Sequence, residues 1–135
     1  MYRRLHPRTL VTILLQEMQN SGSLTASCLN AVCFALLDSG FPLKYLLAAV
    51  SAVITSDGHI IVNATNDETD SAIAVFTIVF ESIDKKVVSM TTNGSFVLSQ
   101  LEKVIELSEE SGQKIFDFYR NSIEKRFKKD FNKRL

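Results

Sequence analysis

A long run of small and apolar residues between positions 23 and 40 constrains the fold most strongly. The segment SLTASCLNAVCFALLDSG starts with hydroxyl side chains that can cap a helix, continues with Leu and Ala, and stops at Gly40 with Pro42 just beyond. This pattern predicts an α-helix over residues 23–40. Apolar side chains cover most of its circumference, so we expect a central helix with little exposed surface. These side chains are Leu24, Cys28, Leu29, Val32, Cys33, Leu36 and Leu37.

Strand patterns lie on both sides of this helix. Residues 9–18, TLVTILLQEM, are rich in β-branched and aliphatic side chains after Pro7, which predicts a first strand. Residues 46–55 and 59–63 flank the tripeptide Ser-Asp-Gly, whose residues suit a tight turn. These two segments therefore predict a β-hairpin.

A second hairpin is predicted farther along the chain. Residues 71–82 are apolar on both alternating faces, as in a strand that is covered on both sides. Residues 86–92, KVVSMTT, end at Asn93-Gly94, which is a strong turn signal.

The last third of the chain predicts one long amphipathic helix. Ser99 and Glu102 have the spacing of a capping box, which would start this helix. Gly112 lies inside it and predicts a bend or a close packing contact. Small and apolar residues recur on one helical face. They are Leu101, Ile105, Ser108, Gly112, Ile115, Tyr119, Ile123 and Phe127.

The order strand, helix, hairpin, hairpin, helix predicts an α+β domain. Its largely antiparallel sheet would pack with the central helix and the long C-terminal helix. The 135 residues, 46% of them hydrophobic, suffice for one core, so we expect a single domain over residues 1–135. Lys plus Arg and Asp plus Glu both number 15, so any affinity for nucleic acid must come from local charge segregation.

Three further features bear on the cellular setting. The basic start precedes only a short apolar stretch with no cleavage site, so we expect no signal peptide. Polar residues 19–23 interrupt the uncharged stretch before Asp38, which argues against a membrane span and for a soluble protein. Cys28 and Cys33 would lie roughly 140° apart on a helix, so they should neither bridge nor share a metal. They are interpreted as small core residues in a reducing compartment.

Two short motifs are candidates for binding chemistry. Ser21-Gly22-Ser23 precedes a helix whose free N–H groups could hold a phosphate, or it is a plain helix cap. Asp57 and Asn63 could face one another across the first hairpin. Because an amide oxygen is a weaker ligand than a carboxylate, Asp57 is more simply explained as the polar residue of the turn.

The two histidines and the charged end of the last helix carry weaker signals. We assign no catalytic role to His6, which precedes Pro7, or to His59, which lies beside the turn and should face solvent. Residues 102–110 are mostly acidic, whereas residues 120–134 are mostly basic. The basic end is either a solvated face that suits a helix C-terminus or a contact for RNA phosphates or an acidic partner.

Four segments together resemble the RNase PH family, in particular the ring subunits of the eukaryotic RNA exosome. They are LHPRTLVTILLQ, GSLTASCLNAVCFALLDSGFPL, SAVITSDGHIIV and FYRNSIEKRFKK. The pattern L-N-A-x-x-x-A-L-x-D-x-G-x-P, which starts at Leu29, is the most specific part. The resemblance implies the second half of an RNase PH-like fold, and the segment expected before Leu5 is missing from the sequence.

The resemblance also implies that catalytic groups are lost. Active members carry Gly-Ser-Arg at the start of the helix, where this chain has Gly22, Ser23 and Leu24. They also carry an Asp-Gly and a second Asp shortly after it, where this chain keeps Asp57 but has Asn63. The implied function is a non-catalytic structural subunit of the exosome ring that supports 3′-to-5′ RNA processing and degradation.

The same resemblance implies which partners and which cellular locations are expected. They are other RNase PH-like ring subunits and RNA bound through the assembled complex, in the nucleus, nucleolus and cytoplasm, with no membrane. Without the other half, the sheet should expose apolar surface and unpaired edges, so the isolated chain could form homo-oligomers. No metal or cofactor is expected, apart from Mg²⁺ and inorganic phosphate if activity remains.

Two alternatives stay open. The first is a nuclease with residual phosphorolysis, or one that uses Asp57 with Asp67, Glu68 and Asp70 for metal-dependent hydrolysis. The second is an RNA-binding fragment that acts through the basic end of the last helix. The side chains concerned are Arg120, Lys125, Arg126, Lys128 and Lys129.

Overall fold

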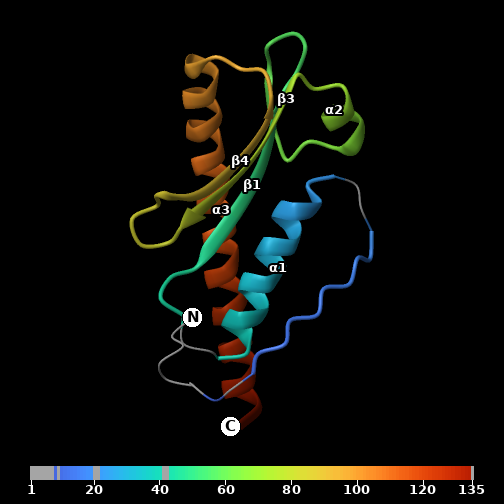
Figure 1. The fold of residues 1–135 in the computed structure, drawn as a ribbon. Coiled ribbons are helices and arrows are strands. Elements are labelled where there is room, and N and C mark those ends of the chain that lie inside the picture. The colour runs from blue at the N-terminus through green and yellow to red at the C-terminus, as the bar shows by residue number, and fades with distance from the viewer. Residues whose placement is uncertain (1–7, 9, 20–21, 41–42, 135) are drawn as a thin grey trace.

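A computed structural model describes residues 8, 10–19, 22–40 and 43–134. The elements along the chain are α1 (Leu24–Asp38), β1 (Leu47–Ile54), β2 (Ile60–Val62), α2 (Asn66–Asp70), β3 (Ala74–Glu81), β4 (Val87–Gly94) and α3 (Leu98–Arg134). The strands form one antiparallel sheet in the order β2-β1-β3-β4 (Figure 1). The predicted α+β class, both hairpins and both long helices are confirmed.

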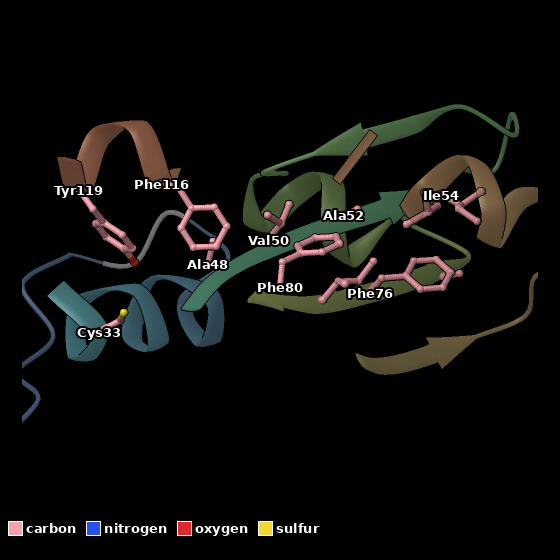
Figure 2. Packing of buried hydrophobic residues seen from close by; sticks show 12 residues of the cluster. Cys33, Ala48, Val50, Ala52, Ile54, Phe76, Phe80, Phe116 and Tyr119 are labelled. Carbon is pink, nitrogen blue, oxygen red and sulfur yellow. The ribbon is translucent and has the colours of Figure 1, made fainter. Parts of the chain in front are cut away.

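The hydrophobic core lies between one face of the sheet and α3. Alternate residues of the two central strands point to this side, as Val50 and Phe76 do, and belong to one buried cluster with Phe116 and Tyr119 of α3 (Figure 2). A smaller cluster on the other side joins Ala26 of α1 to Ala49 and Val79. Both central strands are therefore buried, which explains why their apolar residues do not alternate with polar ones.

Asn30 of α1 closes the free edge of β1 where β2 has ended. Its side-chain amide donates to the carbonyl of Ala49 at 2.9 Å, and its carbonyl oxygen accepts from the Ala49 N–H at 2.7 Å. The Tyr119 hydroxyl donates to the carbonyl of Leu47 at 3.1 Å, and the Leu47 N–H points to Cys33 Sγ at 3.3 Å. Side chains thus satisfy the backbone groups that a longer β2 would pair.

This position makes α1 an edge helix and not the central helix that we expected. Only Ala26 and Cys33 of α1 are buried, whereas Leu24 and Leu29 are 41% and 36% exposed. The expectation was wrong because α1 lies beside β1 (Figure 1), so only part of its circumference meets the sheet and α3. Its apolar outer side remains open.

The predicted first strand is also wrong over the residues that the structure describes. Residues 10–19 form no strand, and Leu10, Leu14 and Met18 are about nine-tenths exposed. Figure 1 draws this segment on the far side of α1 from the sheet. A strand needs backbone to pair with, and the nearer edge of the sheet offers only the three residues of β2 beside the part of β1 that Asn30 satisfies.

Two local signals were misplaced. Asn93-Gly94 makes no hairpin turn, because both residues belong to β4 and pair with Val75 and Ala74. The turn between β3 and β4 lies at residues 82–86 instead. Ser99 does not cap α3, which begins at Leu98, and the first-turn contact is the Val97 N–H donating to Gln100 Oε1 at 3.1 Å.

The helix α3 packs its central turns against the sheet and extends beyond it. Val104, Ser108, Gly112, Phe116 and Tyr119 are its buried residues. A Cβ on Gly112 would lie 3.2 Å from the Phe80 ring, so the predicted close packing is confirmed. No helix in the described part of the chain combines the length and hydropathy that a membrane crossing needs.

Candidate functional site

The predicted phosphate loop lies against the segment that follows β2. Gly22 has φ 131°, and a Cβ on it would lie 2.5 Å from the Ala64 carbonyl oxygen, so only glycine fits there. The Ser23 hydroxyl donates to the same oxygen at 3.4 Å. The turn before α1 is therefore held close to residues 63–65.

Ser23 does not cap α1 with its side chain as the sequence predicted. It has φ 55°, and its hydroxyl points to Ala64 and not to the N–H groups of the first helical turn. The first residues of α1 carry no acidic side chain. Leu24, which stands where the resemblance places an arginine, is 41% exposed and brings no positive charge to this end of the helix.

Asp57 and Asn63 do not face one another across the first hairpin. The ladder pairs Ile54 with Ile60, so Asp57 lies in the exposed turn beyond that pair. Asn63 lies at the other end of β2, where its N–H donates to the Ser51 carbonyl at 2.8 Å. Since a strand rises about 3.3 Å per residue, the two side chains are separated by roughly 10 Å or more.

Asn63 is the one of the two that lies near the phosphate loop. It precedes Ala64, which contacts Gly22 and Ser23, and it has φ 57°, a conformation that asparagine tolerates. The structure therefore brings Gly22, Ser23 and Asn63 into one region and leaves Asp57 outside it. Sequence spacing missed this, because a short β2 sends residues 63–65 toward the start of α1.

A surface pocket of about 500 Å³ adjoins Asn63 between α1 and α3. Phe34 and Phe118 line it with ring centroids 6.0 Å apart, and Lys114 adds an ammonium group. Because no carboxylate lines this pocket, its chemistry suits an anion or an aromatic group better than a metal cation.

The acidic residues of the alternative nuclease site belong to α2. Asp67 and Asp70 are exposed, and Glu68 serves the helix start: its N–H donates to Thr65 Oγ1 at 3.4 Å, and its Oε1 accepts from that hydroxyl at 3.1 Å. Thr65 was not recognised in the sequence as the N-cap of this helix. Across the described residues, no three His, Cys, Asp or Glu side chains gather as metal ligands would.

The histidines and cysteines, which were not assigned a binding or catalytic role, lie in different surroundings. His59 is exposed beside the turn, where its N–H donates to Thr55 Oγ1 at 3.1 Å, and His6 lies outside the described residues. Cys33 is buried as predicted, whereas Cys28 is only half-buried.

At the basic end of α3, one arginine forms an ion pair within the chain and several lysines are exposed. Arg126 forms an ion pair with Asp38, the last residue of α1, and lies 4.0 Å from Asp130. Lys125, Lys128 and Lys129 are exposed and make no ion pair within the part of the chain that the structure describes. At about 100° per residue these lysines occupy one sector of the helix, and Arg120 lies outside it.

Buried Tyr119 is the residue whose ionisation the fold alters most clearly. Burial raises the pKa of its hydroxyl above the usual tyrosine range, and the neighbouring Cys33 raises the pKa further. Tyr119 therefore stays a neutral hydrogen-bond donor to Leu47 and is unsuited to act as a base at neutral pH.

Comparison with known proteins now identifies the family. Residues 45–111 match the RNase PH family model described as "3' exoribonuclease family, domain 2". The chain belongs to the RNase PH family. This match covers the whole antiparallel sheet, from β1 to β4, and the first turns of α3 up to residue 111.

Relatives and solved structures of this RNase PH chain agree with that assignment. It is 31% identical over 128 residues to "Exosome complex component RRP46 homolog" of Caenorhabditis elegans, covering 93% of this chain and 60% of that protein. It is 28% identical over 120 residues to "Exosome complex component ski6" of Schizosaccharomyces pombe, covering 88% of this chain and 48% of that protein. The RNase PH chain thus spans about half to three-fifths of these relatives.

Two crystal structures resemble the fold of the RNase PH chain. Rice Rrp46 matches with a TM-score of 0.74 and 28% identity, over 79% of this chain and 51% of that one. The structure titled "cell-death-related nuclease 5" of C. elegans matches with a TM-score of 0.69 and 29% identity, over 79% of this chain and 59% of that one.

Proposed function

We propose that the chain acts as a structural, non-catalytic part of the exosome ring and supports 3′-to-5′ RNA processing and degradation. The observation that carries this proposal is the helix start at Gly22 and Ser23, where the expected arginine is Leu24. The naming of relatives as exosome complex components supports the assembly role. The partners would be other RNase PH-like ring subunits, with RNA bound by the assembled complex.

The loss of catalysis follows from electrostatics. A phosphate at the start of α1 would meet backbone N–H groups but no guanidinium, because Leu24 is apolar. Asn63, which precedes the Ala64 that contacts this loop, is neutral and can neither bind Mg²⁺ strongly nor accept a proton. Stabilisation of charge is commonly the largest catalytic contribution, so both changes should remove phosphorolysis.

Co-expression with RNase PH-like exosome subunits tests the assembly role. The expected result is a stable complex of defined mass in size-exclusion chromatography with light scattering. The same chain carrying Asn121→Ala, an exposed change on α3, should assemble equally well and serves as the matched control. Failure to join any ring subunit, with the chain folded by circular dichroism, would refute the assembly role.

A separate assay tests the absence of catalysis. The assembled complex would be incubated with end-labelled RNA, inorganic phosphate and Mg²⁺. We expect Asp57→Asn to leave the product formation unchanged, because Asp57 lies in the exposed turn away from Gly22 and Ser23. Loss of product with this variant would instead favour the nuclease alternative.

Direct RNA binding is the second candidate function, and the exposed lysine sector of α3 favours it. Replacing Lys125, Lys128 and Lys129 with glutamate should weaken binding of single-stranded RNA and lower its dependence on salt. Charge reversal of the exposed residues Lys85, Lys86 and Lys103, which lie away from the last turns of α3, is the matched control. Equal losses for both sets would assign the binding to general charge and refute a dedicated site.

We further propose that the chain is found in the nucleus, nucleolus and cytoplasm. Imaging of a fluorescently tagged chain tests this, and exclusion of the tagged chain from the nucleus would contradict it.

A further inference from the structure

A surface pocket of about 540 Å³ lies where the turn between β3 and β4 meets α3, and we call it the turn pocket. Figure 1 shows this turn at the end of the sheet away from α2. The lining includes neither Gly22 and Ser23 of the phosphate loop nor the exposed lysines of the α3 sector, so the turn pocket is separate from both. Part of its wall is apolar, and the side chains concerned are Leu37, Leu46, Phe116 and Ile123.

Two cations from different elements line the turn pocket. Lys85 belongs to the β3–β4 turn and Arg120 to α3, and neither side chain forms an ion pair with a residue that the structure describes. The carboxylate of Asp84, beside Lys85, lies 3.7 Å from the Lys86 ammonium instead. Among the described lining residues Glu124 supplies the single carboxylate, so positive charge exceeds negative charge in the pocket.

The backbone at Lys85 is an independent observation. Its φ of 54° lies in the left-handed region, where glycine or asparagine is the usual residue of a hairpin loop. A lysine at this position lowers the stability of the turn. Because such conformations concentrate at binding sites, the side chain of Lys85 is better explained by what its ammonium binds than by the turn itself.

We propose that the turn pocket binds a nucleoside monophosphate. A phosphate monoester carries a charge between about −1.5 and −2 at neutral pH, which matches two cations, whereas a carboxylate or a phosphodiester carries a single charge. The Arg120 guanidinium can bind two phosphate oxygens at once, and Lys85 adds a point charge. The pocket is far larger than a phosphate ion, and its apolar wall suits the base.

Glu124 favours a nucleotide over other phosphate monoesters. It lies one helical turn after Arg120 on α3, so a ligand whose phosphate is held by Arg120 presents its next chemical group to this carboxylate. In a nucleotide that group is the ribose, whose hydroxyls donate hydrogen bonds to acidic side chains. The inference stands on the pocket alone and does not require the ring role.

Isothermal titration calorimetry of the purified chain tests the ligand class. Adenosine 5′-monophosphate (AMP) should bind saturably, and adenosine and inorganic phosphate should each bind at least about tenfold more weakly, because each lacks one of the recognised parts. Adenosine that binds as tightly as AMP would remove the role of the cations. Equal affinity for inorganic phosphate would remove the role of the apolar wall. Either result, or the absence of saturable AMP binding, would overturn the inference.

Lys85→Gly separates ligand binding from folding. This change should weaken AMP binding about tenfold, because a charge-assisted contact is lost. The variant should unfold at a urea concentration no lower than wild type, since glycine adopts a positive φ without strain. Lys86→Gln removes the same charge from a neighbouring exposed residue outside the pocket lining and should keep wild-type affinity. A Lys85→Gly chain that binds AMP normally, or equal losses in both variants, would contradict the site.

Arg120→Gln and Glu124→Gln give opposite readouts with two ligands. Arg120→Gln should weaken the binding of both AMP and inorganic phosphate, because both ligands use the guanidinium. Glu124→Gln should weaken AMP binding alone, because the carboxylate accepts from the ribose and repels a phosphate ion. Glu109→Gln removes the same charge on the exposed side of α3 and is the control, and circular dichroism checks the fold of each variant. Unchanged AMP binding in Arg120→Gln would overturn the phosphate site, and unchanged AMP binding in Glu124→Gln would overturn the choice of a nucleotide.

Discussion

Asn30 takes the place of a strand residue at the edge of β1. Its two hydrogen bonds to Ala49 satisfy backbone groups that would otherwise lie unpaired between α1 and the sheet. A buried backbone group that loses its partner costs about 1–3 kcal/mol, so the free energy of unfolding depends strongly on this one amide.

Asn30→Ala should therefore lower the free energy of unfolding by about 2–4 kcal/mol. Urea denaturation followed by circular dichroism measures the change. Asn121→Ala on the exposed surface of α3 is the control and should stay within about 0.5 kcal/mol of wild type. An Asn30 variant as stable as wild type would show that water replaces the amide at this edge.

Tyr119 makes a prediction about pH. Its pKa is raised by burial, so the folded state keeps the proton after the unfolded state has lost it. This contribution to stability is present below about pH 10 and declines as the pH rises further. The difference in free energy of unfolding between wild type and Tyr119→Phe should therefore shrink between about pH 9 and pH 11. Tyr45→Phe is the control, because Tyr45 is 38% exposed. A difference that stays constant for Tyr119 would contradict the proton linkage.

The candidate site was only partly predictable residue by residue. Gly22 and Ser23 were correctly placed at the start of α1, because glycine and capping residues mark helix starts locally. The contact of Gly22 with Ala64 could not be foreseen, since it joins segments about 40 residues apart. The predicted pairing of Asp57 with Asn63 was wrong, because the two residues lie beyond opposite ends of the short strand β2.

At the scale of elements, local sequence signals predicted the helices and hairpins, but they did not predict which distant segments lie side by side. The helix over residues 24–38 and the two hairpins follow mainly from their apolar runs, and the Ser-Asp-Gly turn of the first hairpin was also placed correctly. The Asn93-Gly94 signal of the second hairpin was not. The absence of a strand over residues 10–18 depends on whether a sheet edge is free, which no local pattern records. The exposed outer side of α1 depends likewise on where the sheet ends.

The ion pair between Arg126 and Asp38 links the ends of the two long helices. Both side chains are about half exposed, so we expect Asp38→Asn to lower the free energy of unfolding by no more than about 1 kcal/mol. Denaturation at low and high salt measures this, and the difference should shrink at high salt. The control is Glu109→Gln on the exposed side of α3. A loss well above that of a surface pair would mean that the contact positions the C-terminal half of α3.

At the scale of the whole molecule, stability should be concentrated in the two central strands. Inward-facing amides of β1 and β3 are covered by α3 and by neighbouring strands, so they should exchange hydrogen most slowly. Residues 10–19 form no strand or helix and should exchange fastest. Hydrogen exchange resolved by residue measures both, and strong protection in residues 10–19 would contradict the arrangement.

The two edges of this sheet differ in length, and that difference decides where another strand could pair. A sheet with long free edges can add strands and grow into a fibre. Here β2 has only three residues and the Asn30 amide satisfies the β1 backbone beside it, so this edge offers little backbone to a neighbour. The eight exposed residues of β4 form the longer edge, so the tendency of the chain to aggregate should depend on what covers β4.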